Sequence, residues 1–435
     1  MKKLIASVGL AALGVSTLHA QNSPGPTPAE LARPWSVGLT VRGFYDDNPL
    51  TAPNNVARTS YGTEVSPSVS LNHTVQDTAF NLSYVYDWRY YESLSTSDTS
   101  HQFNANVKQS FSDRYSLQAG ESFVVAQEPT VIDPSITTSP LRTSGNNIHN
   151  TGTLGFTAEL APKLDLQLAY ANNLYAYQQT YGDVYNPAGF ALNPSRSALL
   201  DRIEQLFTVS LNWKIKSELT GVLGYSYGNN DYTSPEPIVF AGAVGAQTFG
   251  NPLNIFSKVR DSDSHFFFVG ADEAFTSQLN GSIRVGGEYV DYYKAHTTEV
   301  SPYVDASLTW TYMEGSYAQV GAKHLHSATD VVGAFTAGGQ PVLDAETTAA
   351  YLSVNQKIAG GFNAGLLGQF QHSAFKGGTV NGESEDFFIV GLNLGYRFNE
   401  YLNAETGYNW NKLVSDVSGR DYTRNMVYVG VRATY

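Results

Sequence analysis

The sequence predicts an all-β protein, a transmembrane antiparallel up-and-down β-barrel of about 18 strands with short periplasmic turns and long extracellular loops. Apolar and polar residues alternate along many short segments of the chain. The connections between these segments are short and long in turn. No continuous apolar run of about 18 residues follows the first twenty, so membrane-spanning helices are not expected. A sheet in lipid must close, because open edges leave backbone N–H and C=O groups without hydrogen bonds.

The start of the chain has the pattern of an export signal. Two lysines precede a short apolar run, and Ala20 ends an acceptable small-residue cleavage site. We therefore expect residues 1–20 to be a cleaved signal peptide and the polar, Pro-rich residues 21–34 to form a periplasmic tether. This tether is too short for a plug domain. No later domain boundary is visible, so the barrel is expected to take up residues 35–435.

The composition narrows the class of protein. The chain has 0 Cys, which excludes a disulfide scaffold and a thiolate metal site. Its formal net charge of −13 argues against nucleic acid as a partner. Charged residues make up only 15% of the chain while Tyr (28) and Phe (22) are abundant, which fits an apolar outside and a polar inside. The mean hydropathy of −0.23 is that of a soluble protein, but alternating strands give a weak hydropathy signal.

The predicted strands follow one another along the chain, and each alternates between two faces. The clearest runs over 78–91, where Leu82 and Trp88 share one face and Asn81 and Arg89 share the other. The first nine strands are expected at 35–46, 61–75, 78–91, 101–111, 115–127, 148–160, 163–178, 202–213 and 218–230. The remaining nine are expected at 265–275, 278–293, 299–312, 316–327, 347–358, 362–374, 385–398, 401–413 and 421–435.

The loops between these strands give the barrel its expected orientation. In outer-membrane barrels the short turns are periplasmic and the long loops extracellular. An even number of strands places both ends of the barrel on the short-turn, periplasmic side. Three long Pro- and Gly-containing loops, at 128–147, 180–200 and 231–261, are candidates for folding inward as a constriction.

Charged residues fall on the strand phase opposite the apolar stripes, so we expect them to line the lumen. An Arg or Lys on the lipid face near the midplane would cost about 2–4 kcal/mol. Two interpretations remain open: a basic ladder that guides anionic sugars or small acids, and a mixed-charge network that holds the wall together. The candidate pore-lining residues are Arg42, Asp87, Arg89, Lys108, Arg284, Glu288, Asp305, Lys357, Arg397, Glu405 and Arg432.

Aromatic residues gather near the strand ends, which is typical of the girdles at membrane interfaces. The five tryptophans are Trp35, Trp88, Trp213, Trp310 and Trp410. Tyrosines on the apolar phase fit lipid-facing girdles better than a sugar slide in the lumen; they are Tyr84, Tyr86, Tyr90, Tyr225, Tyr227, Tyr289 and Tyr408. The alternative fold, a soluble β-sandwich or solenoid, would have to bury these aromatic residues and the apolar stripes in a core.

The last strand resembles the carboxy-terminal assembly signal of bacterial outer-membrane barrels, polar-x-Gly-x-x-apolar-x-aromatic. The pattern lies on Tyr428, Gly430, Ala433 and Tyr435, although Ala433 is small for its position. Together with Gly43-Phe-Tyr-Asp-Asp-Asn-Pro49, this strand makes the mature chain similar to the family described as putative β-barrel porin type 2. The resemblance implies an outer-membrane pore, and the family includes barrels linked to extracellular polysaccharide biosynthesis.

Three short groups were weighed as sites of chemistry. The run Asp46-Asp47-Asn48 offers oxygen ligands for Ca²⁺, but Asp and Asn are also common turn residues. His324 and His326 share a strand face without an evident third metal ligand. His372-Ser373, near Asn381, is too little for a nucleophile scheme. We therefore expect no enzyme activity, no cofactor and no metal.

The sequence thus predicts an outer-membrane porin-like channel that passes small hydrophilic solutes through a polar lumen. The alternative is a barrel for extracellular polysaccharide export or secretion that docks partners and is not a general pore. The expected location is the outer membrane of a Gram-negative-type bacterium. The expected partners are outer-membrane lipid and lipopolysaccharide, the barrel-assembly machinery, and small hydrophilic solutes or polysaccharide.

Overall fold

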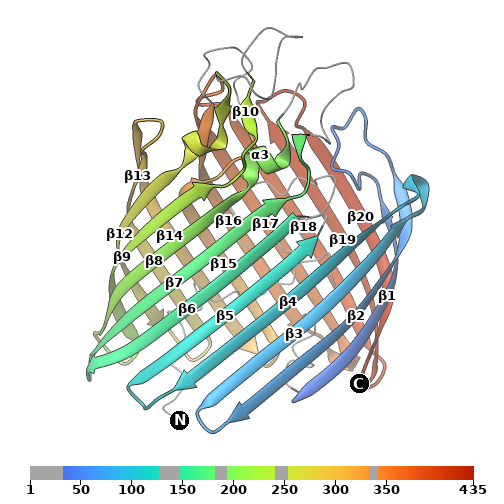
Figure 1. Ribbon diagram of the computed structural model, residues 1–435. Coiled ribbons are helices and arrows are strands. Elements are labelled where there is room, and N and C mark those ends of the chain that lie inside the picture. The colour runs from blue at the N-terminus through green and yellow to red at the C-terminus, as the bar shows by residue number, and fades with distance from the viewer. Residues whose placement is uncertain (1–32, 127–146, 182–193, 241–252, 333–340) are drawn as a thin grey trace.

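The chain folds into one closed β-barrel, as the sequence predicted (Figure 1). The computed structural model describes residues 33–126, 147–181, 194–240, 253–332 and 341–435. One 18-stranded sheet closes on itself because its first and last strands pair, from Gly38 opposite Thr434 to Asp46 opposite Met426. The expected signal peptide, most of the tether and nearly all of the loop at 128–147 lie outside the described residues.

All neighbouring strands of the barrel pair antiparallel and follow the order of the chain. The first nine are β1 (Trp35–Asp46), β2 (Ser60–Val75), β3 (Thr78–Tyr91), β4 (Thr96–Ser110), β5 (Tyr115–Ala126), β6 (Asn147–Ala161), β7 (Leu164–Tyr177), β8 (Arg202–Lys214) and β9 (Leu219–Tyr232). The other nine are β12 (Ser262–Ala274), β13 (Leu279–Tyr292), β14 (Thr297–Met313), β15 (Ser316–Ser327), β16 (Val342–Lys357), β17 (Phe362–Gly377), β18 (Ser384–Arg397), β19 (Leu402–Ser415) and β20 (Tyr422–Thr434).

The two faces of the barrel wall differ in polarity because the side chains of a strand alternate. In β1 every second residue is exposed on the outside: Trp35 and Val37 are each 51% exposed. The residues between them point inward, and Thr40 is 0% exposed. Large apolar side chains of the other strands are exposed in the same way, so the outside of the barrel is an apolar surface of the kind that a bilayer covers.

Two strands begin five residues earlier than the sequence predicted. β4 starts at Thr96, not at 101, because Thr96–Ser100 pairs with the end of β3 although this polar stretch has no alternation of its own. β16 starts at Val342, not at 347, and its first residues are buried on both faces beneath neighbouring loops. In both cases pairing with a neighbour extends a strand beyond its own sequence pattern.

The connections at one end contain short elements that the sequence did not reveal. They are η1 (Glu92–Leu94), α3 (Arg196–Leu200), β10 (Pro237–Val239), β11 (Ile255–Phe256) and η2 (Ser257–Arg260); η3 (Ala359–Gly361) lies in a turn at the other end. We call these ends the long-loop end and the short-turn end. Figure 1 shows α3 and β10 at the long-loop end, opposite the C-terminus. Among the described residues, no helix is long and apolar enough to cross a bilayer.

Candidate functional site: the inner wall and the loop cap

The strand register places all eleven candidate charges on the inner face of the wall. Residues that are Cα partners across strands share a face, and one such row crosses the place where the barrel closes. This row, which we call the seam row, contains Glu405, Gly430, Arg42, Glu64, Arg89 and Asp98 on six neighbouring strands. Following the register around the barrel brings the remaining candidates onto the same face.

Ion pairs connect the charges of the seam row. Arg42 lies between two carboxylates, with Nη1 3.1 Å from Glu64 Oε1 and Nε 2.5 Å from Glu405 Oε1. Arg89 Nη2 lies 3.1 Å from the other oxygen of Glu64 and 3.4 Å from Asp87 Oδ2. Glu64 is 0% exposed and Arg42 is 6% exposed, so removing one partner would leave a buried charge uncompensated. This part of the inner wall is therefore a mixed-charge network.

Two glycines make room for arginines that reach across the closing strands. Arg42 on β1 crosses β20 at Gly430, where an added Cβ would lie 2.6 Å from Arg42 Cγ. Arg432 on β20 crosses β1 at Gly38 and donates to Ser68 Oγ on β2 at 3.2 Å. A third arginine, Arg424, binds Asp46 across the same pair of strands. The glycine of the terminal pattern thus has a local role in barrel closure.

The remaining candidates are less tightly bound. Arg284 pairs with Asp272 at 2.9 Å, and Glu288 accepts a hydrogen bond from the backbone N–H of His326 at 2.9 Å. The others have no ion pair within the part of the chain that the structure describes: Lys108, Asp305, Lys357 and Arg397.

Loops at the long-loop end pack together into a cluster that we call the loop cap. Its apolar centre combines three connections that lie far apart in the sequence: Ala198, Leu199 and Leu200; Ile238 and Val239; and Val332. The fully buried Arg260 binds these connections together. Its guanidinium donates to the carbonyl oxygen of Leu199 (3.4 Å) in one connection and to those of Thr329 (3.1 Å) and Val331 (2.7 Å) in another. It also donates to the carbonyl oxygen of Val342 (2.8 Å) at the start of β16. Two of the three loops that were expected to fold inward, at 180–200 and 231–261, therefore contribute described residues to the cap.

An aspartate between two arginines joins the cap to a further loop. Asp330 lies 2.7 Å from Nη1 of Arg196, the first residue of α3, and 2.8 Å from Nη2 of Arg420, in the connection between β19 and β20. Burial alone would raise the pKa of Asp330, but the two guanidinium groups lower it to about 2. The aspartate is therefore ionised over the whole ordinary pH range and keeps both ion pairs.

The groups weighed as catalytic or metal sites have other partners. His372 and Ser373 point to opposite faces of β17: His372 pairs with Asp386 outside, and Ser373 bonds with Thr347 inside. Their geometry does not support a nucleophile and base. Asn381 instead accepts from the backbone N–H of Gly377, 2.8 Å away.

The other two short groups are also taken up by local contacts. Asp46 binds Arg424, and the carboxylate of Asp47 accepts from Asn425, so these residues serve the turn after β1. His324 contacts Glu346, and His326 contacts Asp344. Within the described ranges, no group of three or more His, Asp and Glu side chains is arranged to hold a metal ion.

The tyrosines of the apolar phase all point outward in the strand register, away from the lumen. Some hydrogen-bond a neighbouring residue on the same face, as Tyr225 does with His265 at 2.8 Å. This arrangement favours the girdle interpretation over a sugar slide.

Sequence reasoning missed several residues that organise the interior. Glu64 stands on the polar phase of β2 and was within reach of the strand pattern. Arg260, Asp330 and Arg420 gave no such signal, because they lie in connections without periodicity.

Residues 233–435 match the model of a family described as putative beta-barrel porin 2. The expected resemblance to this family is thereby confirmed for that part of the chain. No curated protein matches the chain in sequence.

Several solved structures match the chain at low sequence identity. The outer membrane protein OpdK from Pseudomonas aeruginosa is 10% identical, with a TM-score of 0.41 over 92% of this chain and 99% of that one. OccAB3 from Acinetobacter baumannii is 13% identical, with a TM-score of 0.41 over 92% and 99%. OccK2 (OpdF) from Pseudomonas aeruginosa, solved in complex with glucuronate, is 11% identical, with a TM-score of 0.42 over 92% and 98%.

Proposed function

We propose that the protein is an outer-membrane channel through which small hydrophilic solutes diffuse. The observation that carries this proposal is the closed 18-stranded barrel with an apolar outside and a polar inner face. Barrels of about 16–18 strands enclose an aqueous channel unless loops fill them. The polar inner face supplies hydrogen-bonding groups along that channel, and the apolar outer face suits lipid.

The inner charges divide into two classes with different expected effects on solutes. The seam row is a chain of mutually compensated ion pairs, so it stiffens the wall and adds little field to the lumen. Cations without a described ion pair, such as Lys108 and Lys357, attract anions more effectively. We therefore expect the uncompensated cations, and not the seam row, to set the preferred ion sign.

The loop cap supports a selective channel in preference to an open general pore. Arg260 and Asp330 hold three connections in one arrangement at the long-loop end. A fixed cap restricts which solutes enter, whereas loops without such contacts would leave that end open.

The outer surface and the last strand supply the remaining proposed partners. The exposed apolar stripes and aromatic residues would contact outer-membrane lipid and lipopolysaccharide. The terminal strand, with Tyr428, Gly430, Ala433 and Tyr435, would be the segment that the barrel-assembly machinery binds before closure.

A liposome-swelling assay tests solute passage. Residues 21–435 are refolded, inserted into liposomes and diluted into isotonic sugars of increasing size. Swelling with small sugars that slows as the sugar grows is the expected result. Folded barrels, identified by their heat-modifiable mobility, that give no swelling with any sugar would contradict the proposal and favour a partner-docking role.

A further inference from the structure

We propose that the inner wall at the short-turn end holds a binding site for a small hydroxylated carboxylic acid, of the size of one or two sugar units. The site lies on β2 to β5, away from both the seam row and the loop cap. This inference rests on the proposed channel, because a solute reaches the site through the lumen.

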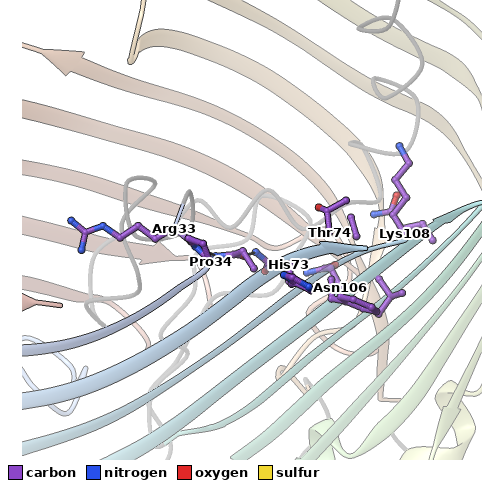
Figure 2. Close-up of a pocket in the computed structure, with 12 residues that line it drawn as sticks. Arg33, Pro34, His73, Thr74, Asn106 and Lys108 are labelled. Carbon is purple, nitrogen blue, oxygen red and sulfur yellow. Dashed lines mark hydrogen bonds between the residues drawn. The ribbon is translucent and has the colours of Figure 1, made fainter. Parts of the chain in front are cut away.

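A cavity of about 430 Å³ marks the site (Figure 2). Ligand sites commonly measure about 300–1,000 Å³, so this volume suits a small solute. The cavity also borders His73, Phe80 and Val107, whose side chains the register places on the outward face of the wall. Its polar lining includes Asn72, Thr74, Asn81, Asn106, Lys108 and Gln118.

Three polar residues of the lining have hydrogen-bonding capacity to spare. The side chains of Asn106, Lys108 and Gln118 make no hydrogen bond or ion pair within the described residues. A side-chain amide offers donors and an acceptor together, which matches a pair of neighbouring hydroxyl groups. By contrast, Asn81 donates to Asn72, which itself donates to the carbonyl of Arg33 at 3.0 Å. These two residues form a fixed edge beside the uncommitted groups.

The strand register brings the uncommitted groups together on the inner face of β4 and β5. Lys108 lies opposite Gln118, and the next inward pair is Asn106 opposite Gly120. A Cβ at Gly120 would lie 2.9 Å from Asn106 Oδ1 and 2.7 Å from Thr153 Oγ1. The side chains of Thr153 and Asn106 thus occupy the space above Gly120, and glycine at this position lets Asn106 keep its place in the lining of the cavity.

The charge of the lining selects an acid. No carboxylate lines the cavity, although the whole chain carries a formal net charge of −13. Its cations are Arg33 and Lys108, and Figure 2 shows them at opposite ends of the pocket. The guanidinium of Arg33 donates to the backbone carbonyl of Glu400 at 3.4 Å. This leaves Lys108 to receive a carboxylate, since charge-assisted hydrogen bonds are roughly twice as strong as neutral ones.

Isothermal titration of the refolded barrel tests the site with three probes: D-glucuronate, D-glucose and acetate. We expect D-glucuronate to bind at least tenfold more tightly than D-glucose, which lacks the carboxylate, and than acetate, which lacks the hydroxyl groups. Lys108→Gln should remove the difference between the two sugars. The matched control is Lys357→Gln, which neutralises another inner-face lysine near the short-turn end outside this cavity and should preserve the difference.

The outcomes separate this inference from the channel proposal. The proposed site would be overturned if D-glucose or acetate bound as tightly as D-glucuronate. It would also be overturned if the Lys108→Gln variant still bound D-glucuronate more tightly than D-glucose by the wild-type factor. A second variant, Gly120→Val, should weaken the binding of both sugars because the added side chain displaces Asn106 from the lining, and unchanged affinities would also count against the site. If D-glucuronate binds but no solute crosses the membrane, the channel proposal fails while the site stands.

Discussion

Replacing Asp330 with asparagine should loosen the loop cap without unfolding the barrel. Asp330 is 8% exposed and binds Arg196 and Arg420, at 2.7 and 2.8 Å. Asparagine keeps the shape but loses the charge that both guanidinium groups face. The strands are held by their own hydrogen-bond ladders, so the lost free energy should appear as local opening of the cap.

The size of the effect follows from the pKa of Asp330, which falls from 3.8 to about 2 on folding. At 1.36 kcal/mol per pKa unit, this difference corresponds to about 2.5 kcal/mol. Breaking a buried ion pair by removing one partner typically costs about 3–5 kcal/mol, in the same range. At about 1.4 kcal/mol per tenfold change, a loss of 2.5 kcal/mol raises the open population of the cap about 60-fold.

Hydrogen exchange measured by mass spectrometry reads this opening directly. Peptides covering 194–200 and 328–332 should exchange about 60-fold faster in Asp330→Asn, while peptides from β17 to β20 should not change. The matched control is Asp416→Asn, whose carboxylate accepts from Ser384 and pairs with no arginine of the described residues. Unchanged exchange in both cap peptides would refute the assigned role of Asp330. Faster exchange throughout the strands would show that the effect of the substitution is not confined to the cap.

Three further predictions concern pH, closure and ion selectivity. Because the pKa of Asp330 is lowered in the folded protein, Asp330 should stabilise the cap fully above about pH 4 and lose this effect as the pH falls toward 2. The noise of the wild-type channel current should therefore rise as the pH falls through this window. A noise level that does not depend on pH in this window would contradict the stabilising role of the ionised Asp330. Gly430→Ala should destabilise the barrel by about 1–3 kcal/mol, because the added Cβ would lie 2.6 Å from Arg42 Cγ and from the carbonyl oxygen of Val41. The control is Gly43→Ala, whose added Cβ would have no atom within 4 Å. Equal denaturation midpoints for the two variants would argue against the crossing of Arg42 at Gly430. Arg284→Glu should shift the reversal potential toward cation selectivity, and Arg284→Gln should shift it by less, because the first adds a carboxylate beside Asp272; an unchanged potential would remove Arg284 from the pore wall.

The strand pattern was sufficient to predict the fold and to sort residues between the two faces. The period of two residues assigns Val37 to the outside and Arg42 to the inside without any knowledge of tertiary structure. The same rule assigns Glu405 to the inner face. It does not predict that Arg42 and Glu405 touch, because that contact depends on the register of β20 between them and on the closure of the whole sheet.

The loop cap lay beyond sequence reasoning for a different physical reason. Arg260 is satisfied by backbone carbonyls, and any residue type provides a carbonyl, so its partners leave no mark on the sequence. Asp330 meets Arg196 and Arg420 from loops that are separated by more than one hairpin. Such connections have no periodic sequence pattern, so contacts between them can be identified only after the strands that they join have been positioned in the barrel.

The proposed binding site lies between these two cases. Lys108 was recognised as an inner-face cation from its strand phase. The spare hydrogen-bonding capacity of Asn106 and Gln118, and the position of the Asn106 side chain over Gly120, emerge only from the register of β4 and β5. The alternation indicates which residues face the lumen, but not which of them are already bonded to each other.

Single-channel recording of refolded residues 21–435 in a planar bilayer, with a salt gradient across it, tests the central claim most directly. A continuous hydrated lumen predicts steady, ohmic conductance steps, and uncompensated cations such as Lys108 predict a reversal potential that shows attraction of anions. Folded, heat-modifiable barrels that insert but carry no current would contradict the channel and mean that the interior is filled.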